Sequence, residues 1–194
     1  MNPVQKIIAA MALGLIAAAA SAAPVTYTFD TTHSRVTFYV NHFGFSNSVG
    51  EFKLGDGTFT FDGDDWSKSK VDARIPVQTL ELGDLKWNTH VLSPDFLESA
   101  KYPEITFVSK KVEKIDATHG KVYGDLTIKG VTKPVVLDLT VNKVGEHPVR
   151  KTQAAGFTAT TIVRRSEFGV SLYAPAVADD VVIRIEVEAF VPKV

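Results

Sequence analysis

Apolar and polar residues alternate with a period of two along most of the chain after residue 24. This period is typical of half-buried β-strands, because successive strand side chains point to opposite faces. In the clearest segment, VVIRIEVEAF, Val181, Ile183 and Ile185 fall on one face, and Arg184 and Glu186 on the other. Turn-forming glycine and aspartate residues separate such segments. We therefore predict an all-β protein, either a sandwich or a barrel.

The stretch between residues 84 and 99 does not follow this alternation. Asp84 is placed to cap a short helix that runs to Leu92, and Ser93 is placed to cap a second one with Pro94 at its first position. Asp95 would suit the positive end of that second helix. We expect one or two short helices here.

The composition is that of a single globular domain, with 194 residues of which 45% are hydrophobic and 22% charged. The absence of cysteine excludes disulfides and thiolate metal sites. The formal net charge is -1 and no basic tract is present, so we expect no nucleic-acid partner.

Residues 1–22 have a different pattern from the rest of the chain. Lys6 precedes an apolar run, and Ala20-Ser21-Ala22 fits the small-residue pattern of a cleavage site. The run is shorter than the roughly 20 residues that a membrane span needs, although a membrane anchor is the alternative. We predict a signal peptide over residues 1–22, cleaved to leave residues 23–194 as one exported domain that does not span the membrane.

Motifs for metal binding or catalysis are missing from the sequence. The histidines lack the spacing of known metal sites: His33, His42, His90, His119 and His147. The chain has no GxSxG elbow and no Walker or GxGxxG loop. The pairs Asp64-Asp65 and Asp179-Asp180 lie in apparent turns. We predict no metal site, no cofactor and no catalytic residue.

Aromatic residues close to a few polar ones form the remaining group of interest. They are His42 to Phe45, Trp87 with Asn88 and His90, Phe96, and Arg164-Arg165 before Phe168. Such a mixture is typical of a pocket for an apolar ligand with a polar end. It is equally typical of side chains that plug an ordinary core. A barrel of about eight strands either fills itself with side chains or holds one small ligand, and residue types leave both open.

Four blocks of the chain resemble the YceI-like polyisoprenoid-binding family. They are DTTHSRVTF followed by HFGFSNSVGEF, HVLSPDFLESAKYPEITFVS, GDLTIKGVTKPVVLDL and RRSEFGV. They occur in the family's order and spacing from Tyr27 to about Phe190. The resemblance implies an extended, lipocalin-like antiparallel β-barrel in the periplasm. It also implies an apolar tunnel that binds, transports or stores a polyisoprenoid lipid, either of quinone type or an isoprenyl phosphate.

The chain departs from that family pattern just before His90. Many members have Arg-Asp where this chain has Trp87 and Asn88, and the pattern's Leu and second Phe are Val91 and Leu97 here. The change removes a charged pair and adds an amphipathic aromatic ring. We therefore expect a neutral head group, such as a quinone, in place of a pyrophosphate.

Within this interpretation, we select candidate ligand-binding residues from the aromatic and polar groups named above and from the inward faces of the strands. The tunnel-wall candidates are Phe38, Val40, Phe43, Phe45, Phe96 and Phe107. The candidates for the mouth, where a head group would lie, are His42, Trp87, Asn88, His90 and Arg165. For Arg165 the alternative is an ion pair with Glu167 or with a buried carboxylate.

Other readings of the sequence remain open at this point. The protein could be a redox accessory that presents a bound quinone to a membrane cytochrome, or a hydrolase that uses Asp95 and His90. A filled, ligand-free barrel core is the structural alternative. By analogy, a second copy of the chain is a candidate partner.

Overall fold

The computed structural model describes residues 23–192, so the predicted signal peptide lies outside the described residues. Within these residues, ten strands and one α-helix follow one another. The strands are β1 (Val25–Phe29), β2 (Arg35–His42), β3 (Ser46–Lys53), β4 (Gly57–Phe61), β5 (Lys70–Pro76), β6 (Glu104–Lys114), β7 (His119–Ile128), β8 (Val131–Glu146), β9 (Gln153–Arg164) and β10 (Val177–Phe190). The helix is α1 (Leu85–Leu92), and short 3-10 turns are η1 (Trp66–Lys68), η2 (Val77–Thr79) and η3 (Arg165–Phe168).

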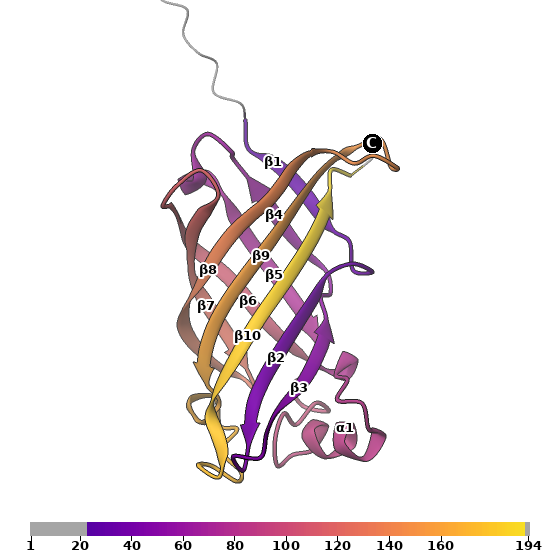
Figure 1. Ribbon diagram of the computed structural model, residues 1–194, viewed down its shortest axis with the longest axis vertical. Helices are drawn as coiled ribbons and strands as arrows, with labels where there is room; N and C mark the ends of the chain where they lie inside the picture. Colours follow the sequence, from indigo (N-terminus) through magenta and orange to yellow (C-terminus); the bar gives the residue numbers. More distant parts are fainter. Residues whose placement is uncertain (1–22, 193–194) are drawn as a thin grey trace, which may run out of the picture.

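The strands form one closed antiparallel sheet in the order β1-β4-β5-β6-β7-β8-β9-β10-β2-β3, with β1 also paired to β10. β1 and β2 lie one after the other along β10, since Phe29 is opposite Ala189 and Arg35 is opposite Glu186. On the next position in the sheet, β4 pairs with β1 and β3 pairs with β2, so these two strands also lie one after the other. The sheet is therefore an elongated eight-stranded barrel (Figure 1), which confirms the predicted fold class.

The strand register places the predicted apolar faces inside the barrel. Ile183 of β10 is opposite Phe38 of β2, and Ile185 is opposite Val36; all four residues line the interior. The alternate position Arg184 lies on the outer face, where its guanidinium contacts the Glu186 carboxylate at 2.6 Å. The period of two in the sequence thus corresponds to an inside and an outside.

One of the two predicted helices is present. The Asp84 carboxylate accepts a hydrogen bond from the Trp87 N–H at 2.9 Å and caps α1, as predicted. Ser93 instead ends α1, and its carbonyl accepts the N–H groups of Phe96 (3.1 Å) and Glu98 (2.8 Å) in a turn. The turn does not extend into a helix because Glu98 adopts a left-handed conformation with φ of 50°.

Aromatic side chains fill one end of the barrel. Trp66 of η1 is 2% exposed, and its ring meets that of Phe61 edge-on with centroids 5.5 Å apart. Phe157 of β9 packs against Phe61 at 5.4 Å and Phe59 at 4.7 Å. Gly120 leaves the space, because a Cβ there would lie 2.6 Å from the Trp66 ring. We call Phe59, Phe61, Trp66 and Phe157 the aromatic plug.

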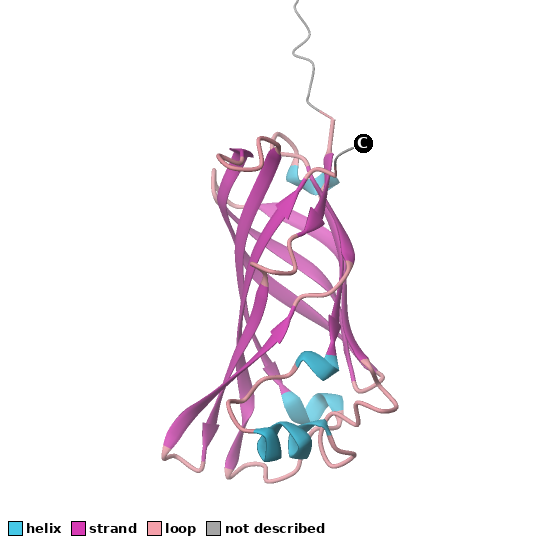
Figure 2. Cartoon of the chain, turned by 90° about the vertical axis from the view of Figure 1, so that its right-hand side faces the viewer, coloured by secondary structure: helices cyan, strands magenta, loops and turns pink. Residues whose placement is uncertain are grey.

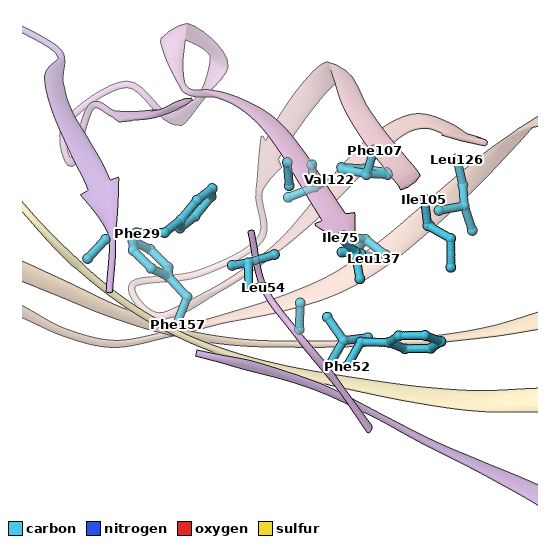
Figure 3. Packing of buried hydrophobic residues seen from close by; sticks show 14 of the residues in the cluster. Phe29, Phe52, Leu54, Ile75, Ile105, Phe107, Val122, Leu126, Leu137 and Phe157 are labelled. Carbon is cyan, nitrogen blue, oxygen red and sulfur yellow. The ribbon is translucent and has the colours of Figure 1, made fainter. Parts of the chain in front are cut away.

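Aliphatic and aromatic residues continue the buried cluster away from the plug. Figure 3 shows Phe29 and Phe157 at one side of it and Ile105 and Leu126 at the other. Among residues 23–192, no helix combines the length and the apolar character that a membrane span needs.

Candidate ligand-binding cavity

The barrel encloses a cavity of about 340 Å³. All ten strands and α1 contribute to its wall, and most of the lining side chains are aliphatic or aromatic. The volume falls at the lower end of the range of small-ligand pockets, about 300–1,000 Å³. The interior is therefore not completely filled by side chains, and an apolar ligand suits its wall.

The cavity extends to exposed lining residues at the end opposite the aromatic plug. There the β2–β3 turn, α1 and the β9–β10 loop come together, at the lower end of the barrel in Figures 1 and 2. The residues that line this end include the exposed His90 and Tyr173, the latter 51% exposed. We call this end the mouth.

Two groups of rings surround the mouth, and α1 links them. The His42 ring lies between Phe43, with centroids 4.6 Å apart, and Trp87, at 6.3 Å. The His90 ring contacts Phe96 at 5.0 Å and Tyr173 at 6.4 Å. Trp87 and His90 are three residues apart on α1, so they share one face of the helix and both face the cavity.

Arg165 lines the cavity, but its guanidinium is engaged by the backbone. Four of its N–H groups donate to carbonyls at 2.7–3.0 Å: Val170, Leu172, Val177 and Ala178. Burial lowers its pKa, and the Asp179 carboxylate opposes this effect only in part. The predicted alternative partners, Glu167 and a buried carboxylate, are not its hydrogen-bond acceptors. Arg165 therefore holds the β9–β10 loop in shape.

Asn88 does not line the cavity, in contrast to the prediction that placed it at the mouth. Its side-chain oxygen accepts the Leu82 N–H at 2.8 Å, its amide lies 3.4 Å from the Glu81 carboxylate, and it is 8% exposed. The helix explains the difference, because Asn88 follows Trp87 directly and so points about 100° away from it around the axis. Asn88 fixes the segment before α1.

The predicted wall residues divide into two sets. Phe38, Val40, Phe96 and Phe107 line the cavity, whereas Phe43 and Phe45 do not. Phe43 is 46% exposed and Phe45 is 91% exposed. Both lie in the β2–β3 turn, where Phe43 and Gly44 adopt φ angles of 55° and 77°. Because Phe38, Val40 and His42 point inward, strand alternation itself places positions 43 and 45 on the outer face, so placing them in the wall did not follow from the strand period.

Several lining residues were not predicted from the sequence. Phe59, Phe61 and Phe157 lie on strands whose alternation was recognised, and extending the inward face of each strand would have found them. Tyr173 lies in the β9–β10 loop, where no periodicity applies, and its contacts with His90 and Phe96 depend on the folded barrel.

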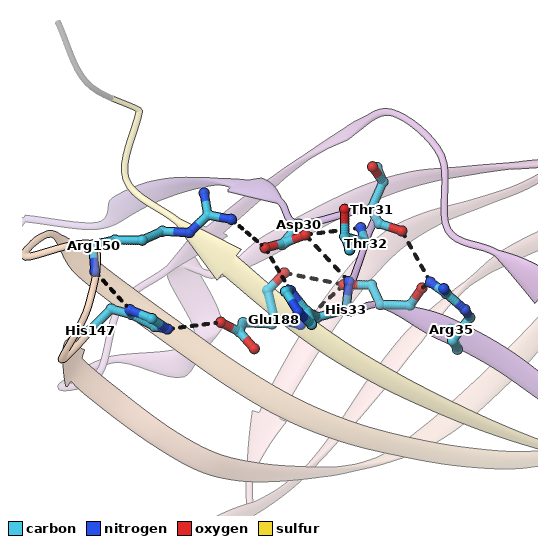
Figure 4. A network of polar contacts seen from close by, with 9 residues as sticks. Asp30, Thr31, Thr32, His33, Arg35, His147, Arg150 and Glu188 are labelled. Atoms are coloured by element: carbon cyan, nitrogen blue, oxygen red, sulfur yellow. Dashed lines mark hydrogen bonds and ion pairs between the residues drawn. The ribbon is translucent and has the colours of Figure 1, made fainter.

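A polar network lies toward the other end of the barrel (Figure 4). The Asp30 side chain is 5% exposed; one of its oxygens contacts His33 Nδ1 at 3.0 Å and Arg150 Nη2 at 2.8 Å. Its other oxygen accepts the N–H groups of Thr32 and His33. His147 of the β8–β9 hairpin approaches the Glu188 carboxylate at 3.4 Å. We call Asp30, His33, His147, Arg150 and Glu188 the polar clasp.

The clasp joins three separate segments at the break between β1 and β2. Burial alone would raise the pKa of Asp30, but the hydrogen bonds from the His33 ring and the Thr32 and His33 N–H groups lower it overall. Asp30, His33 and Glu188 offer ligand atoms within 4.8 Å of one another. A metal ion there would compete with Arg150 for Asp30, and the absence of a metal site stays a prediction.

The comparisons with known proteins agree with this architecture. A family profile described as the YceI-like domain matches residues 27–189. The chain belongs to the YceI-like domain family. A UPF0312 protein of Pseudomonas savastanoi pv. phaseolicola is 38% identical over 169 residues, which cover 86% of this chain and 88% of the relative. The family predicted from the four sequence blocks is thereby confirmed.

Solved structures share the fold. BcnA of Burkholderia cenocepacia superposes with a TM-score of 0.74 at 26% identity, over 82% of this chain and 98% of BcnA. A domain from Saccharophagus degradans, described as polyisoprenoid binding and implicated in plant cell wall breakdown, has a TM-score of 0.65. It covers 87% of this chain and 99% of its own, and its 14% identity establishes likeness of fold alone.

In this YceI-like domain, the blocks that carried the resemblance lie toward both ends of the barrel. DTTHS supplies Asp30 and His33 of the polar clasp, and HVLSPDF supplies His90 and Phe96 at the mouth. The RRSEFG block supplies Arg165, which organises the β9–β10 loop.

Proposed function

We propose that this protein binds one polyisoprenoid lipid, with the apolar tail in the barrel cavity and the head group at the mouth. The observation that carries the proposal is the cavity itself, which is walled by apolar side chains from every strand and reaches exposed residues at the mouth. The polyisoprenoid-binding description of a solved domain with the same fold supports this ligand class.

The wall chemistry suits a hydrocarbon chain. Burial of apolar surface is worth about 0.8 kcal/mol per CH₂ group, so each five-carbon isoprene unit would gain on the order of 4 kcal/mol on entering a dry cavity. Phe38, Phe107 and Ile183 supply such a surface without directional hydrogen bonds. Binding of this kind selects for an apolar chain more strongly than for its chemical detail.

The mouth favours a neutral head group such as a quinone. Arg165 has four of its five N–H groups bound to backbone carbonyls, so it offers little to a pyrophosphate. His42 and His90 remain as hydrogen-bonding groups, and Trp87 and Tyr173 provide flat apolar surfaces beside them. The preference for a neutral head therefore rests on Trp87 and Arg165, and no longer on Asn88.

We infer a binding role and not a catalytic one. Within residues 23–192 the His90 side chain makes ring contacts and no hydrogen bond to Asp95, the partner that a hydrolase reading of the sequence would need. The His90 ring packs against Phe96 and Tyr173 in place of a carboxylate. Export to the periplasm, storage as opposed to transport, a membrane cytochrome partner and a homodimer all stay predictions.

Lipid extraction tests the ligand class and the head group together. The protein is purified without detergent after expression with its own residues 1–22, and its extract is analysed by mass spectrometry. We expect a prenylated quinone in near-stoichiometric amount, because an apolar tail in the cavity dissociates slowly. An isoprenyl pyrophosphate as the sole ligand would contradict the neutral head group, and an extract without any isoprenoid would contradict the proposed function.

A further inference from the structure

Four large apolar side chains at the mouth are exposed to solvent. Phe45 is 91% exposed, Leu85 81%, Tyr173 51% and Phe43 46%. They come from three segments that are distant in sequence: the β2–β3 turn, the start of α1 and the β9–β10 loop. We call these four residues the apolar rim. Exposed apolar residues that gather from separate loops around one opening mark an interaction surface.

The structure ties the rim directly to the cavity mouth. Phe43 donates its N–H to the Ala176 carbonyl at 3.1 Å, which joins the β2–β3 turn to the β9–β10 loop. Its ring packs on His42, and Tyr173 packs on His90 and Phe96; these three partners line the cavity. Leu85 opens the helix that carries Trp87 and His90. The rim is therefore continuous with the cavity wall.

The apolar rim contributes little to the stability of the fold, although two of its residues have an unfavourable backbone conformation. Phe43 and Tyr173 have φ angles of 55° and 62°, a left-handed conformation that is unfavourable for bulky residues. Their side chains are about half exposed, so little burial compensates this strain. Phe45 and Leu85 are exposed almost completely. Residues that are both strained and exposed at the entrance to a cavity are more readily explained by function than by stability.

We propose that the apolar rim docks the mouth on the surface of a lipid bilayer, inserting Phe43, Phe45, Leu85 and Tyr173 among the lipid headgroups and upper acyl chains. This inference rests on the proposed function, because a ligand with an apolar tail resides in a bilayer before it is bound. Docking joins the bilayer interior to the cavity, so the tail passes between them without exposure to water. Aromatic and leucine side chains are the usual anchors of proteins that lie on a membrane.

The charges around the rim favour a bilayer without a requirement for anionic lipid. Leu85 lies between the exposed Asp84 and Lys86, which have opposite signs. Arg164 pairs with Glu167 at 3.8 Å and with Asp180 at 3.9 Å, so it is not an isolated cation. Binding should therefore come from apolar insertion and depend weakly on salt.

Vesicle co-sedimentation of the mature chain tests the docking. We expect the protein to bind vesicles of phosphatidylcholine alone, with little change when phosphatidylglycerol or salt is added. The variant Phe45→Ser with Leu85→Ser should lose about tenfold or more in vesicle affinity, because it removes the two most exposed anchors. The matched control is Ile115→Ser with Val149→Ser, which removes 59% and 82% exposed apolar residues at the opposite end; it should bind within about twofold of the parent.

Both variants change exposed side chains, so their thermal unfolding should match that of the parent. Equal vesicle binding by the rim variant and the parent would overturn the proposal, as would a parent that does not bind vesicles. A rim variant that turns a dimer into a monomer while still binding vesicles would also overturn it, in favour of self-association.

A second readout separates this inference from the proposed function. Lipid content after purification reports on the cavity, whereas the rate of quinone transfer from vesicles reports on the rim. We expect the rim variant to retain its lipid but to exchange it about tenfold more slowly. If the parent and the rim variant both carry lipid and exchange it at the same rate, the docking is refuted and the proposed function is not. A parent that holds no lipid would refute the proposed function.

Discussion

The two ends of the barrel contain similar residue types, but these side chains are buried and bonded at one end and exposed or cavity-facing at the other. At the plug end, Trp66 is 2% exposed, and the Asp30 carboxylate is bound by two N–H groups, a histidine and an arginine. At the mouth, Phe45 is 91% exposed, and Trp87 and His90 face a cavity. Aromatic rings therefore fill space at one end and surround an opening at the other.

The contrast separates what stabilises the protein from what binds its ligand. At the plug end, the rings of Phe61 and Trp66 pack together, and Arg150 ties the β8–β9 hairpin to Asp30 at the β1–β2 break. At the mouth the polar groups are used to shape loops: Arg165 holds the β9–β10 loop and Asn88 holds the segment before α1. Substitutions at the two ends should consequently affect different properties.

The two tryptophans give the largest expected difference. Trp66→Ala should lower the free energy of unfolding by about 3–5 kcal/mol, because it removes a fully buried ring and leaves a cavity. Trp87→Ala should lower it by about 1 kcal/mol or less, because that ring is partly exposed beside an existing cavity. Denaturant titration measures both values. The contrast fails if the two substitutions destabilise the protein equally.

The polar clasp should give a smaller effect that depends on pH. Asp30→Asn removes the charge that pairs with His33 and Arg150, and we expect a loss of about 1–2 kcal/mol at neutral pH because both partners are exposed to solvent. The folded state lowers the pKa of Asp30. Its contribution is therefore complete above the unfolded pKa of about 3.9 and is lost as the pH falls through the folded value.

This pH dependence is checked by measuring the unfolding free energies of the parent and of Asp30→Asn from neutral pH to the acid limit of folding. The difference between the two proteins should shrink as the solution becomes more acidic. A matched control is Asp95→Asn at the exposed mouth turn, which should change stability little at any pH. A difference for Asp30→Asn that grows toward acid would contradict the assigned role.

The regular part of the fold follows from local pattern, and this is why the sequence predicted it. Inward positions such as Phe38, Val40 and Phe107 obey strand alternation, and the barrel uses that alternation without change. Asp84 caps α1 because a cap needs only its own next three residues. Structural features that depend on only a few neighbouring residues can therefore be predicted from the sequence.

The features that were missed depend on turns or on distant segments. Phe43 and Phe45 lie outside the wall because they alternate with the inward His42 and stand in a turn where Phe43 is left-handed; their placement in the wall followed their aromatic type and not the strand period. The ion pair between Asp30 and Arg150 joins residues 120 positions apart and exists only in the closed barrel. Arg165 was interpreted as a head-group ligand because its carbonyl partners lie in a loop whose shape the sequence does not specify.

The central claim is that the open cavity holds one lipid, and a substitution that fills the cavity tests it most directly. Ala159 of β9 is 6% exposed, lines the cavity and lies opposite Leu139 and Ile185. Ala159→Trp should occupy the volume that the lipid tail needs, with Ala159→Phe as a smaller change in case the larger ring disturbs folding. On the same strand, Ile162 is 63% exposed, so Ile162→Trp is the matched control.

Native mass spectrometry of the proteins purified without detergent gives the readout. We expect the parent and Ile162→Trp to carry one lipid per chain. Ala159→Trp should carry no lipid and Ala159→Phe a reduced amount, both with unchanged secondary structure. A folded Ala159→Trp protein that carries the same lipid in the same amount would contradict the account.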